Sequence, residues 1–292
     1  MTHAAKRLLS GLFAAAALTC AAAAQEVVAV VSSPPGPYEA AYAGFQRNFG
    51  SPVAVYHLPG EKPAIGPRTR VVVAFGGEAV VLPYPKRVTV IACLAPGVPD
   101  YYIRQGSFAF VAMKPQASAL LAQMQKLQPK LKRLAVLWNT DITGRYLEEL
   151  RGIAGAQGIE TELVRVADVS GLPDALRSLS PKPDALWLAP DPTLVTPESF
   201  QTIKQFSWDS GIPFYAPTSG LAAAGAAAAV SISASETGRA AATLALRALA
   251  GTPLPEISYV ENAELTVNRQ SSAKSGLVLT PEVLSRADKV LP

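Results

Sequence analysis

The chain has 292 residues, enough for one large domain or two of ordinary size, and a formal net charge of +4. Its 26 basic and 22 acidic residues are interspersed, with no cluster of lysine or arginine in the main part of the chain. This distribution argues against nucleic acid and membrane surfaces as partners.

The first 24 residues have the pattern of a secretory signal peptide. Lys6 and Arg7 precede a short apolar run, and small residues then form an A-x-A-like cleavage site. The run is shorter than the roughly 20 residues that a membrane-spanning helix needs. We predict cleavage after Ala24 and location in the periplasm. Lipid anchoring at Cys20 is the less favoured alternative, because the residues before it fit a lipoprotein signal poorly.

Cleavage at this position leaves one cysteine, Cys93, and one histidine, His57. One cysteine cannot form an internal disulfide, and Cys93 lies in an apolar stretch that is typical of a buried strand. The sequence contains no G-x-S-x-G motif, no Cys-x-x-Cys pair and no metal-ligand spacing. We therefore predict that the protein is not an enzyme and that it uses no cofactor or metal.

The first part of the mature chain alternates apolar runs with turns. Strands are predicted at residues 27–31, 53–58, 70–75, 87–94 and 107–113. A helix is predicted after the first strand, because aromatic and small apolar residues recur there at helical spacing: Tyr38, Ala41, Tyr42, Phe45 and Phe49. Gly76 and Gly77 follow the third strand and predict a tight turn and the start of a helix.

The same alternation begins again at residue 115. Helices are predicted at residues 115–127, 143–156, 170–179, 197–210 and 236–250. Strands are predicted at residues 133–138, 160–166, 184–189, 212–216 and 227–233. Thr196 and Pro197 supply an N-cap and a first-turn proline for the fourth helix.

The predicted strands are continuous apolar runs, which are typical of parallel strands covered by helices on both faces. Two successive sets of βα units predict an α/β protein with two doubly wound parallel-sheet lobes. No long Ser/Gly-rich linker separates them. We therefore expect the two lobes to share a cleft.

Ligands of doubly wound sheets bind beyond the carboxyl ends of the strands. The residues expected at or near these ends are small, polar or aromatic, and we predict that they contact a ligand: Ser32, Ser33, Tyr38, Gly76, Gly77, Asn139, Thr140, Thr143, Asp191, Thr193 and Thr218.

Several of these residues have a structural alternative. Asp191, held between two prolines, can accept hydrogen bonds from a ligand ammonium or hydroxyl, or it can form an Asx-turn or a helix cap. Backbone N–H groups at residues 139–143 can hold a carboxylate or phosphate, unless Thr140 or Asp141 caps the helix. Tyr38 either stacks on a ligand or packs in the core. Gly76 and Gly77 are only a weak anion signal, because no G-x-G-x-x-G or P-loop pattern surrounds them.

The C-terminal part contains a series of short motifs. These are Gly251-Thr252-Pro253, Leu265-Thr266-Val267-Asn268, Ala273 with Gly276-Leu277, Pro281-Glu282 and Arg286-Ala287-Asp288, preceded by Glu236-x-Gly238 at the start of a helix. In this order they resemble the tail of the tryptophan/tyrosine-type family of ABC transporter substrate-binding proteins, which adopt the type I periplasmic binding protein fold.

The resemblance implies two lobes joined by a three-crossover hinge, with crossovers near Met113–Pro115, Ser233–Ser235 and Ser258–Glu264. Lobe 1 is then 25–113 plus 235–258, and lobe 2 is 114–234 plus 259–292. It also implies a monomer that closes on a small molecule, which is amino-acid-like in some members, and delivers it to the membrane permease of an ABC importer.

The sequence departs from the family pattern at two places. Ser233 stands where the family often has a strand-end Asp, and we include it among the predicted ligand residues. The first cleft loop is Pro34-Pro35-Gly36-Pro37, which offers no polar side chain. These departures keep a second function open, a ligand-poor sensory or interaction subunit that acts on a membrane partner such as a sensor kinase.

Overall fold

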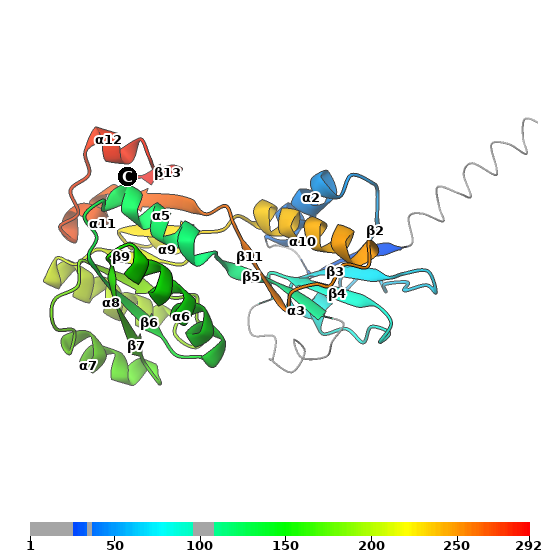
Figure 1. Ribbon diagram of the computed structural model, residues 1–292, viewed down its shortest axis with the longest axis horizontal. Coiled ribbons are helices and arrows are strands. Elements are labelled where there is room, and N and C mark those ends of the chain that lie inside the picture. The colour runs from blue at the N-terminus through cyan, green and yellow to red at the C-terminus, as the bar shows by residue number, and fades with distance from the viewer. Residues whose placement is uncertain (1–25, 34–36, 96–107) are drawn as a thin grey trace, which may run out of the picture. The chain divides into compact units, whose positions relative to one another are not determined.

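The computed structural model describes residues 26–33, 37–95 and 108–292, which form two compact units. One unit contains the described residues up to Ala112 and Ala234–Ser258, and the other contains Met113–Ser233 and Tyr259–Pro292 (Figure 1). The chain therefore passes between the units three times. The predicted signal peptide with Cys20, and residues 34–36 of the first loop, lie outside the described residues.

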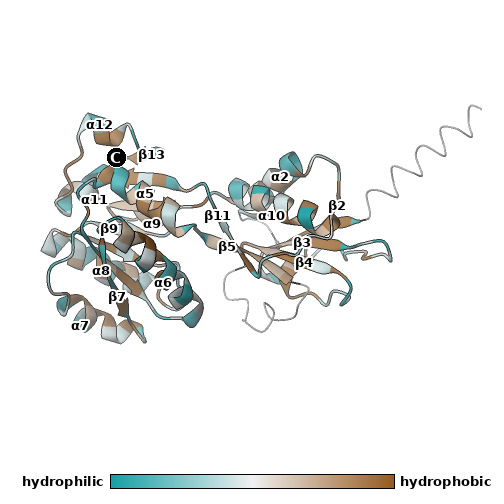
Figure 2. Ribbon diagram, in the orientation of Figure 1, coloured by the Kyte–Doolittle hydropathy of each residue, from teal (hydrophilic) through white to brown (hydrophobic). Residues whose placement is uncertain are grey.

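The first unit is built on a six-stranded sheet with the order β11-β5-β4-β3-β1-β2. Its neighbours from β2 to β5 all pair in parallel. Every residue of β1 and β3 is buried, which explains why these strands are continuous apolar runs (Figure 2). The strands are β1 Val27–Val31, β2 Ala54–His57, β3 Val71–Phe75, β4 Thr89–Cys93, β5 Phe108–Pro115 and β11 Ile257–Val260.

Two helices of the first unit lie side by side although almost 200 residues separate them in sequence. They are α2 (Tyr38–Phe49) and α10 (Ala234–Leu249), as Figure 1 shows. Glycines bring their backbones together, since a Cβ atom on Gly44 would lie 2.2 Å from the Ser235 carbonyl oxygen and one on Gly238 would lie 1.8 Å from that of Ala41. A third helix, α3 (Gly77–Val80), follows β3.

The second unit is built on a seven-stranded sheet with the order β13-β12-β10-β9-β8-β6-β7. Neighbouring strands pair in parallel except β10 and β12, which are antiparallel. The strands are β6 Arg133–Trp138, β7 Glu160–Arg165, β8 Ala185–Leu188, β9 Phe214–Ala216, β10 Ala228–Ser231, β12 Glu264–Asn268 and β13 Lys289–Leu291. The helices are α5 Ala117–Leu127, α6 Asp141–Ala156, α7 Leu172–Arg177, α8 Pro197–Ser210, α9 Ser219–Ala223, α11 Arg269–Lys274 and α12 Pro281–Leu284.

The two sheets repeat one strand order. In the first unit β1 lies between β2 and β3, and in the second β6 lies between β7 and β8. The chain thus crosses to one side of its first strand and then to the other, which is the strand order of a doubly wound fold with a topological switch point. The predicted α/β class with two doubly wound lobes is confirmed.

The boundaries differ from the predicted ones in a few places. Pro115 belongs to β5 rather than to the next helix, because the strand continues through it before α5 begins. Helix α6 begins two residues earlier than predicted. The predicted helix at 170–179 is a 3₁₀ turn, Val169–Gly171, followed by α7, because the Asp168 carboxylate caps the turn at Gly171.

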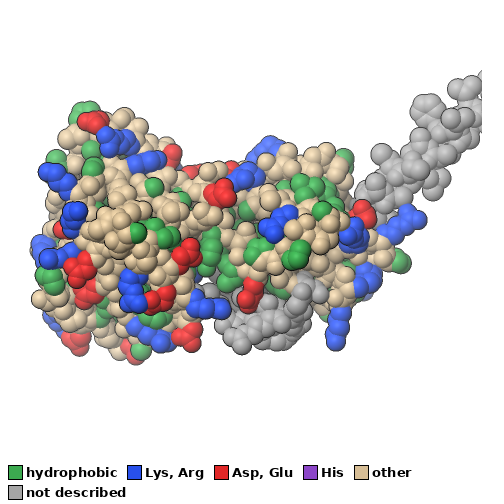
Figure 3. All heavy atoms as spheres, viewed as in Figure 1, with side chains coloured by type: hydrophobic (Ala, Val, Ile, Leu, Met, Phe, Trp, Pro, Cys, Tyr) green, Lys and Arg blue, Asp and Glu red, His purple; other side chains and the backbone are tan. Residues whose placement is uncertain are grey.

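The surface of the protein mixes both charges. Figure 3 shows acidic and basic side chains interspersed over the visible face, without a field of one sign. In the part of the chain that the structure describes, no helix has the length and apolar character needed to cross a bilayer.

Candidate functional site

The strand order places a candidate site on each unit. Ligands of doubly wound sheets bind at the carboxyl edge where the strand order reverses. In the first unit this point lies between β1 and β3, and in the second between β6 and β8. We call them the first edge (Ser32, Ser33, Tyr38, Gly76, Gly77 and Glu78) and the second edge (Asn139, Thr140, Thr143, Asp191 and Thr193).

Ser32 joins the strands of the first edge to the following helix. Its backbone N–H donates to the Phe75 carbonyl oxygen at the end of β3, over 2.8 Å. Its Oγ accepts a hydrogen bond of 3.1 Å from the backbone N–H of Ala79 in α3. The side chain is 3% exposed, so its hydroxyl serves the local structure.

Gly76 is required at this edge by crowding and by its backbone conformation. Its φ is +95°, and a Cβ atom would lie 2.5 Å from Ser32 Oγ and 2.9 Å from Tyr38 Cε1. Such a φ is strained for any residue with a side chain. The predicted turn and helix start at Gly76 and Gly77 are confirmed, since α3 begins at Gly77.

We expect Gly76→Ala to lower the free energy of unfolding by about 2 kcal/mol, because it combines backbone strain with a steric overlap. Gly77→Ala is the matched control, since a Cβ atom there meets nothing within 4 Å. Urea unfolding followed by circular dichroism measures both variants. Equal stability of the two variants would contradict the packing described at Gly76.

Glu78 adds a carboxylate that the sequence analysis did not single out. The Ser33 hydroxyl donates to Glu78 Oε2 over 2.8 Å, and the Ser33 backbone N–H donates over 3.2 Å. These two hydrogen bonds lower the pKa of Glu78 below its ordinary value, and the bond from the Ser33 hydroxyl contributes more than the bond from the Ser33 N–H. Glu78 stays exposed, so the first edge presents a negative charge to solvent.

Asp191 organises the second edge. The residue is fully buried, and its Oδ2 accepts hydrogen bonds from the Asn139 N–H (3.1 Å), the Thr140 N–H (2.7 Å) and the Thr140 hydroxyl (2.9 Å). Its Oδ1 accepts from the N–H of Thr193 (3.1 Å) and from its hydroxyl (2.7 Å). The bond to the Thr193 N–H, two residues on, is that of an Asx-turn, the structural alternative for this side chain.

This arrangement also uses two of the N–H groups that the sequence left available either for an anionic ligand or for capping. The carboxylate at the N-terminus of α6 is the protein's own Asp191, while Thr140, the N-cap residue, makes no capping bond with its side chain. Burial raises the pKa of Asp191, but the hydrogen bonds from Thr140, Thr193 and Asn139 outweigh it and hold the pKa below its ordinary value. Asp191 is therefore a charged group that orders the loops.

The remaining predicted residues of the second unit differ in position. Asn139 Nδ2 donates to the Ala167 carbonyl oxygen and to Thr193 Oγ1, and the buried Thr143 pairs its hydroxyl with that of Thr140 over 3.0 Å. Thr218 lies one strand further, after β9, where it caps α9, and Ser233 follows β10. The structure thus brings Asn139, Thr140, Thr143, Asp191 and Thr193 together, and Thr218 and Ser233 follow other strands. A ligand role for these residues stays a prediction.

Lys114 is a second residue that the sequence analysis missed. It lies near the end of β5, is 8% exposed, and places its ammonium 5.2 Å from the centre of the Tyr146 ring. The Tyr146 hydroxyl donates to the Pro115 carbonyl oxygen over 3.0 Å and fixes the ring. Burial, only partly offset by attraction to Asp191, lowers the pKa of Lys114 to about 8. A single lysine in an otherwise apolar strand was the available signal.

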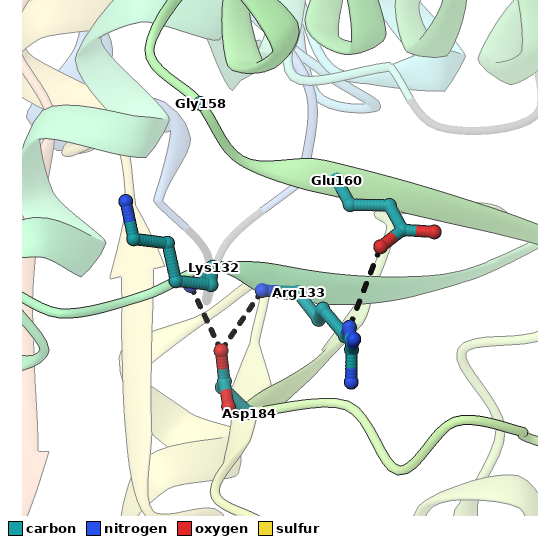
Figure 4. Close-up of a pocket in the computed structure, with 5 residues that line it drawn as sticks. All are labelled: Lys132, Arg133, Gly158, Glu160 and Asp184. Carbon is teal, nitrogen blue, oxygen red and sulfur yellow. Dashed lines mark hydrogen bonds and ion pairs between the residues drawn. The ribbon is translucent and has the colours of Figure 1, made fainter.

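A surface pocket lies at the other end of the second sheet. It has a volume of about 290 Å³ and is lined by Lys132, Arg133, Gly158, Glu160 and Asp184 (Figure 4). Asp184 Oδ2 accepts hydrogen bonds from the backbone N–H groups of Lys132 and Arg133. These residues surround the amino ends of β6, β7 and β8, opposite to the carboxyl edge, so we do not place the functional site there.

Solved structures share this fold. A domain from Streptococcus pneumonia in complex with L-Trp has a TM-score of 0.56 and 17% identity, and the match covers 91% of this chain and all of that one. A ligand-free, open substrate-binding protein with adhesive properties from Clostridium difficile has a TM-score of 0.64 and 14% identity, with 91% and 99% covered. The two lobes therefore have the type I periplasmic binding protein fold.

The family follows from the sequence itself. The sequence model of the family described as ABC transporter substrate binding protein matches residues 116–291, more than half of the chain. The protein belongs to this family, as the C-terminal motifs indicated. A search of curated proteins found no match.

Proposed function

We propose that the protein is an extracytoplasmic solute-binding subunit that captures a small molecule between its two lobes and delivers it to an ABC-type importer. The main support for this proposal is the match to the ABC transporter substrate-binding family, together with the doubly wound strand order that both sheets share. Each lobe has a switch-point edge lined by hydroxyl and amide groups, and such edges are where doubly wound folds bind ligands.

Location and partner follow from the same proposal. Residues 1–24 act as a signal peptide, and the mature protein works in the periplasm as a monomer. Hinge closure around the solute then presents both lobes to a membrane permease. The L-Trp bound by the similar streptococcal domain supports an amino-acid-like or aromatic solute as the first class to test.

Native mass spectrometry of the protein purified from periplasmic extract tests this function. We expect an added mass below about 1 kDa that disappears on denaturation, because binding proteins enclose most of a small ligand's surface. The denatured sample of the same preparation is the control. No added mass, together with no thermal shift across amino acids, sugars and purines, would contradict the proposal.

One observation favours a second function. Several polar groups of both edges are used within the protein, such as Asp191 in its five hydrogen bonds and Ser33 in its bonds to Glu78. A sensory or interaction subunit that acts on a membrane partner such as a sensor kinase would need no ligand contact there. Absence of the added mass, with specific retention of a membrane kinase by the immobilised protein, would support this alternative.

A further inference from the structure

The ammonium of Lys114 is buried, and it donates no hydrogen bond to another described residue. In the described residues its ammonium contacts the face of the Tyr146 ring, and no carboxylate or carbonyl oxygen accepts a hydrogen bond from it. A ring face attracts a cation but does not replace the three hydrogen bonds that an ammonium makes in water. An ammonium that is buried without acceptors destabilises a folded protein, because it loses its hydration.

Asp191 does not accept a hydrogen bond from the Lys114 ammonium. It attracts Lys114 through space, but its two oxygens already accept five hydrogen bonds, all of them from neutral donors. Arg145 acts in the opposite direction, because its positive charge repels the ammonium. Among the residues that the structure describes, Lys114 is therefore left without a direct ionic partner.

The ammonium can still be reached from outside. Lys114 keeps 8% of its surface exposed, so the described residues do not enclose the side chain completely. A small molecule can thus approach the nitrogen, while the surrounding protein removes most of its water. An ion pair formed in such a place is stronger than one at an open surface.

We propose that Lys114 binds the carboxylate of a small organic acid, with the Tyr146 ring packed against the cation, in the unit formed by Met113–Ser233 and Tyr259–Pro292. This inference rests on the proposed function and names its ligand class. A singly charged carboxylate suits the site better than a phosphate dianion, because the negative charge of Asp191 is close enough to act on Lys114.

The lowered pKa of Lys114 predicts that acid binding depends on pH. The groups that act on Lys114 and on its neighbour Tyr146 are Asp191 after β8, Arg145 and Glu149 in α6, and Tyr259 in β11. Because the free ammonium loses its proton near pH 8, affinity for an acid falls as the pH rises through that value. Above it, the decline approaches tenfold per pH unit until the pKa of the bound state is reached.

The test is titration calorimetry at pH 7 with acids and their uncharged amides. The probes are benzoate, phenylacetate, indole-3-propionate and succinate, each with its amide, and inorganic phosphate. We expect at least one acid to bind the mature protein, with its amide and phosphate at least tenfold weaker. Lys114→Met should weaken that acid at least tenfold and remove the pH dependence. The control Lys130→Met removes an exposed charge and should change neither.

Several results would overturn the inference. They are equal binding of acid and amide, preference for phosphate, and unchanged acid binding by Lys114→Met. If that variant does not fold, the acid–amide comparison and the pH profile of the unaltered protein decide. If no acid binds but native mass spectrometry finds a neutral or cationic ligand, the proposed function stands and this inference fails. If neither finds a ligand, both fail.

Discussion

Replacing Gly238 by alanine is expected to lower the free energy of unfolding by about 3 kcal/mol, because it forces α2 and α10 apart. The new Cβ atom would lie 1.8 Å from the Ala41 carbonyl oxygen and 2.6 Å from the Phe45 backbone nitrogen. Both neighbours are backbone atoms and cannot rotate away. Urea unfolding followed by far-ultraviolet circular dichroism is the appropriate measurement, because all three tryptophans, Trp138, Trp187 and Trp208, lie in the other unit.

Gly152→Ala in α6 is the matched control. It also replaces a glycine inside a helix, but a Cβ atom there meets nothing within 4 Å. Alanine should therefore stabilise the protein by about 0.5–1 kcal/mol. If Gly238→Ala behaved like this control, the close contact between the backbones of α2 and α10 would be wrong.

Replacing Asp191 by alanine is expected to lower the free energy of unfolding by about 3–4 kcal/mol, since it removes the buried acceptor of five part-buried hydrogen bonds. The donors come from Asn139, Thr140 and Thr193, so the loops after β6 and β8 should loosen together. Tryptophan fluorescence during urea unfolding reports on this unit, which contains all three tryptophans.

Asp184→Ala gives the comparison for Asp191. Asp184 also accepts hydrogen bonds from two backbone N–H groups, but it is exposed to solvent at the amino ends of the strands. Water can replace the lost acceptor there, so we expect a loss of about 1 kcal/mol. Equal losses for the two variants would show that burial of Asp191 contributes nothing.

The same residue predicts how stability depends on pH. The pKa of Asp191 is lower in the folded protein than its ordinary value of about 3.9 in an unfolded chain. Its stabilising contribution is therefore complete above about pH 5 and is lost as the pH falls through the folded pKa. The difference in unfolding free energy between the unaltered protein and Asp191→Ala should shrink between pH 5 and pH 2. A constant difference over this range would contradict a charged Asp191.

The sequence predicts much of the fold because local signals agree with it. Strand β1 and strand β6 have the bounds predicted from their apolar runs. Helix α8 has its predicted bounds too, since Thr196 accepts a hydrogen bond from the Ser199 N–H over 3.1 Å as an N-cap should. In each case the residues that determine the element lie within it or next to it.

The candidate site is less predictable because its contacts are between distant residues. The Pro-Asp-Pro sequence places Asp191 at the end of a strand, but its partners Asn139 and Thr140 lie about 50 residues earlier. The single lysine in an apolar strand draws attention to Lys114, but nothing in the sequence indicates that it packs against Tyr146. The sequence around Gly238 does not show that the backbone of α2 packs directly against this glycine.

The discontinuous composition of both units has a consequence for the order of synthesis. The first five strands leave the ribosome long before α10, which covers α2, and the second sheet lacks β12 and β13 until almost the last residue. A growing chain therefore cannot complete either unit early, and its first apolar strands stay unburied until the later elements have been made. A shortened product would keep these strands exposed and would therefore be prone to aggregation.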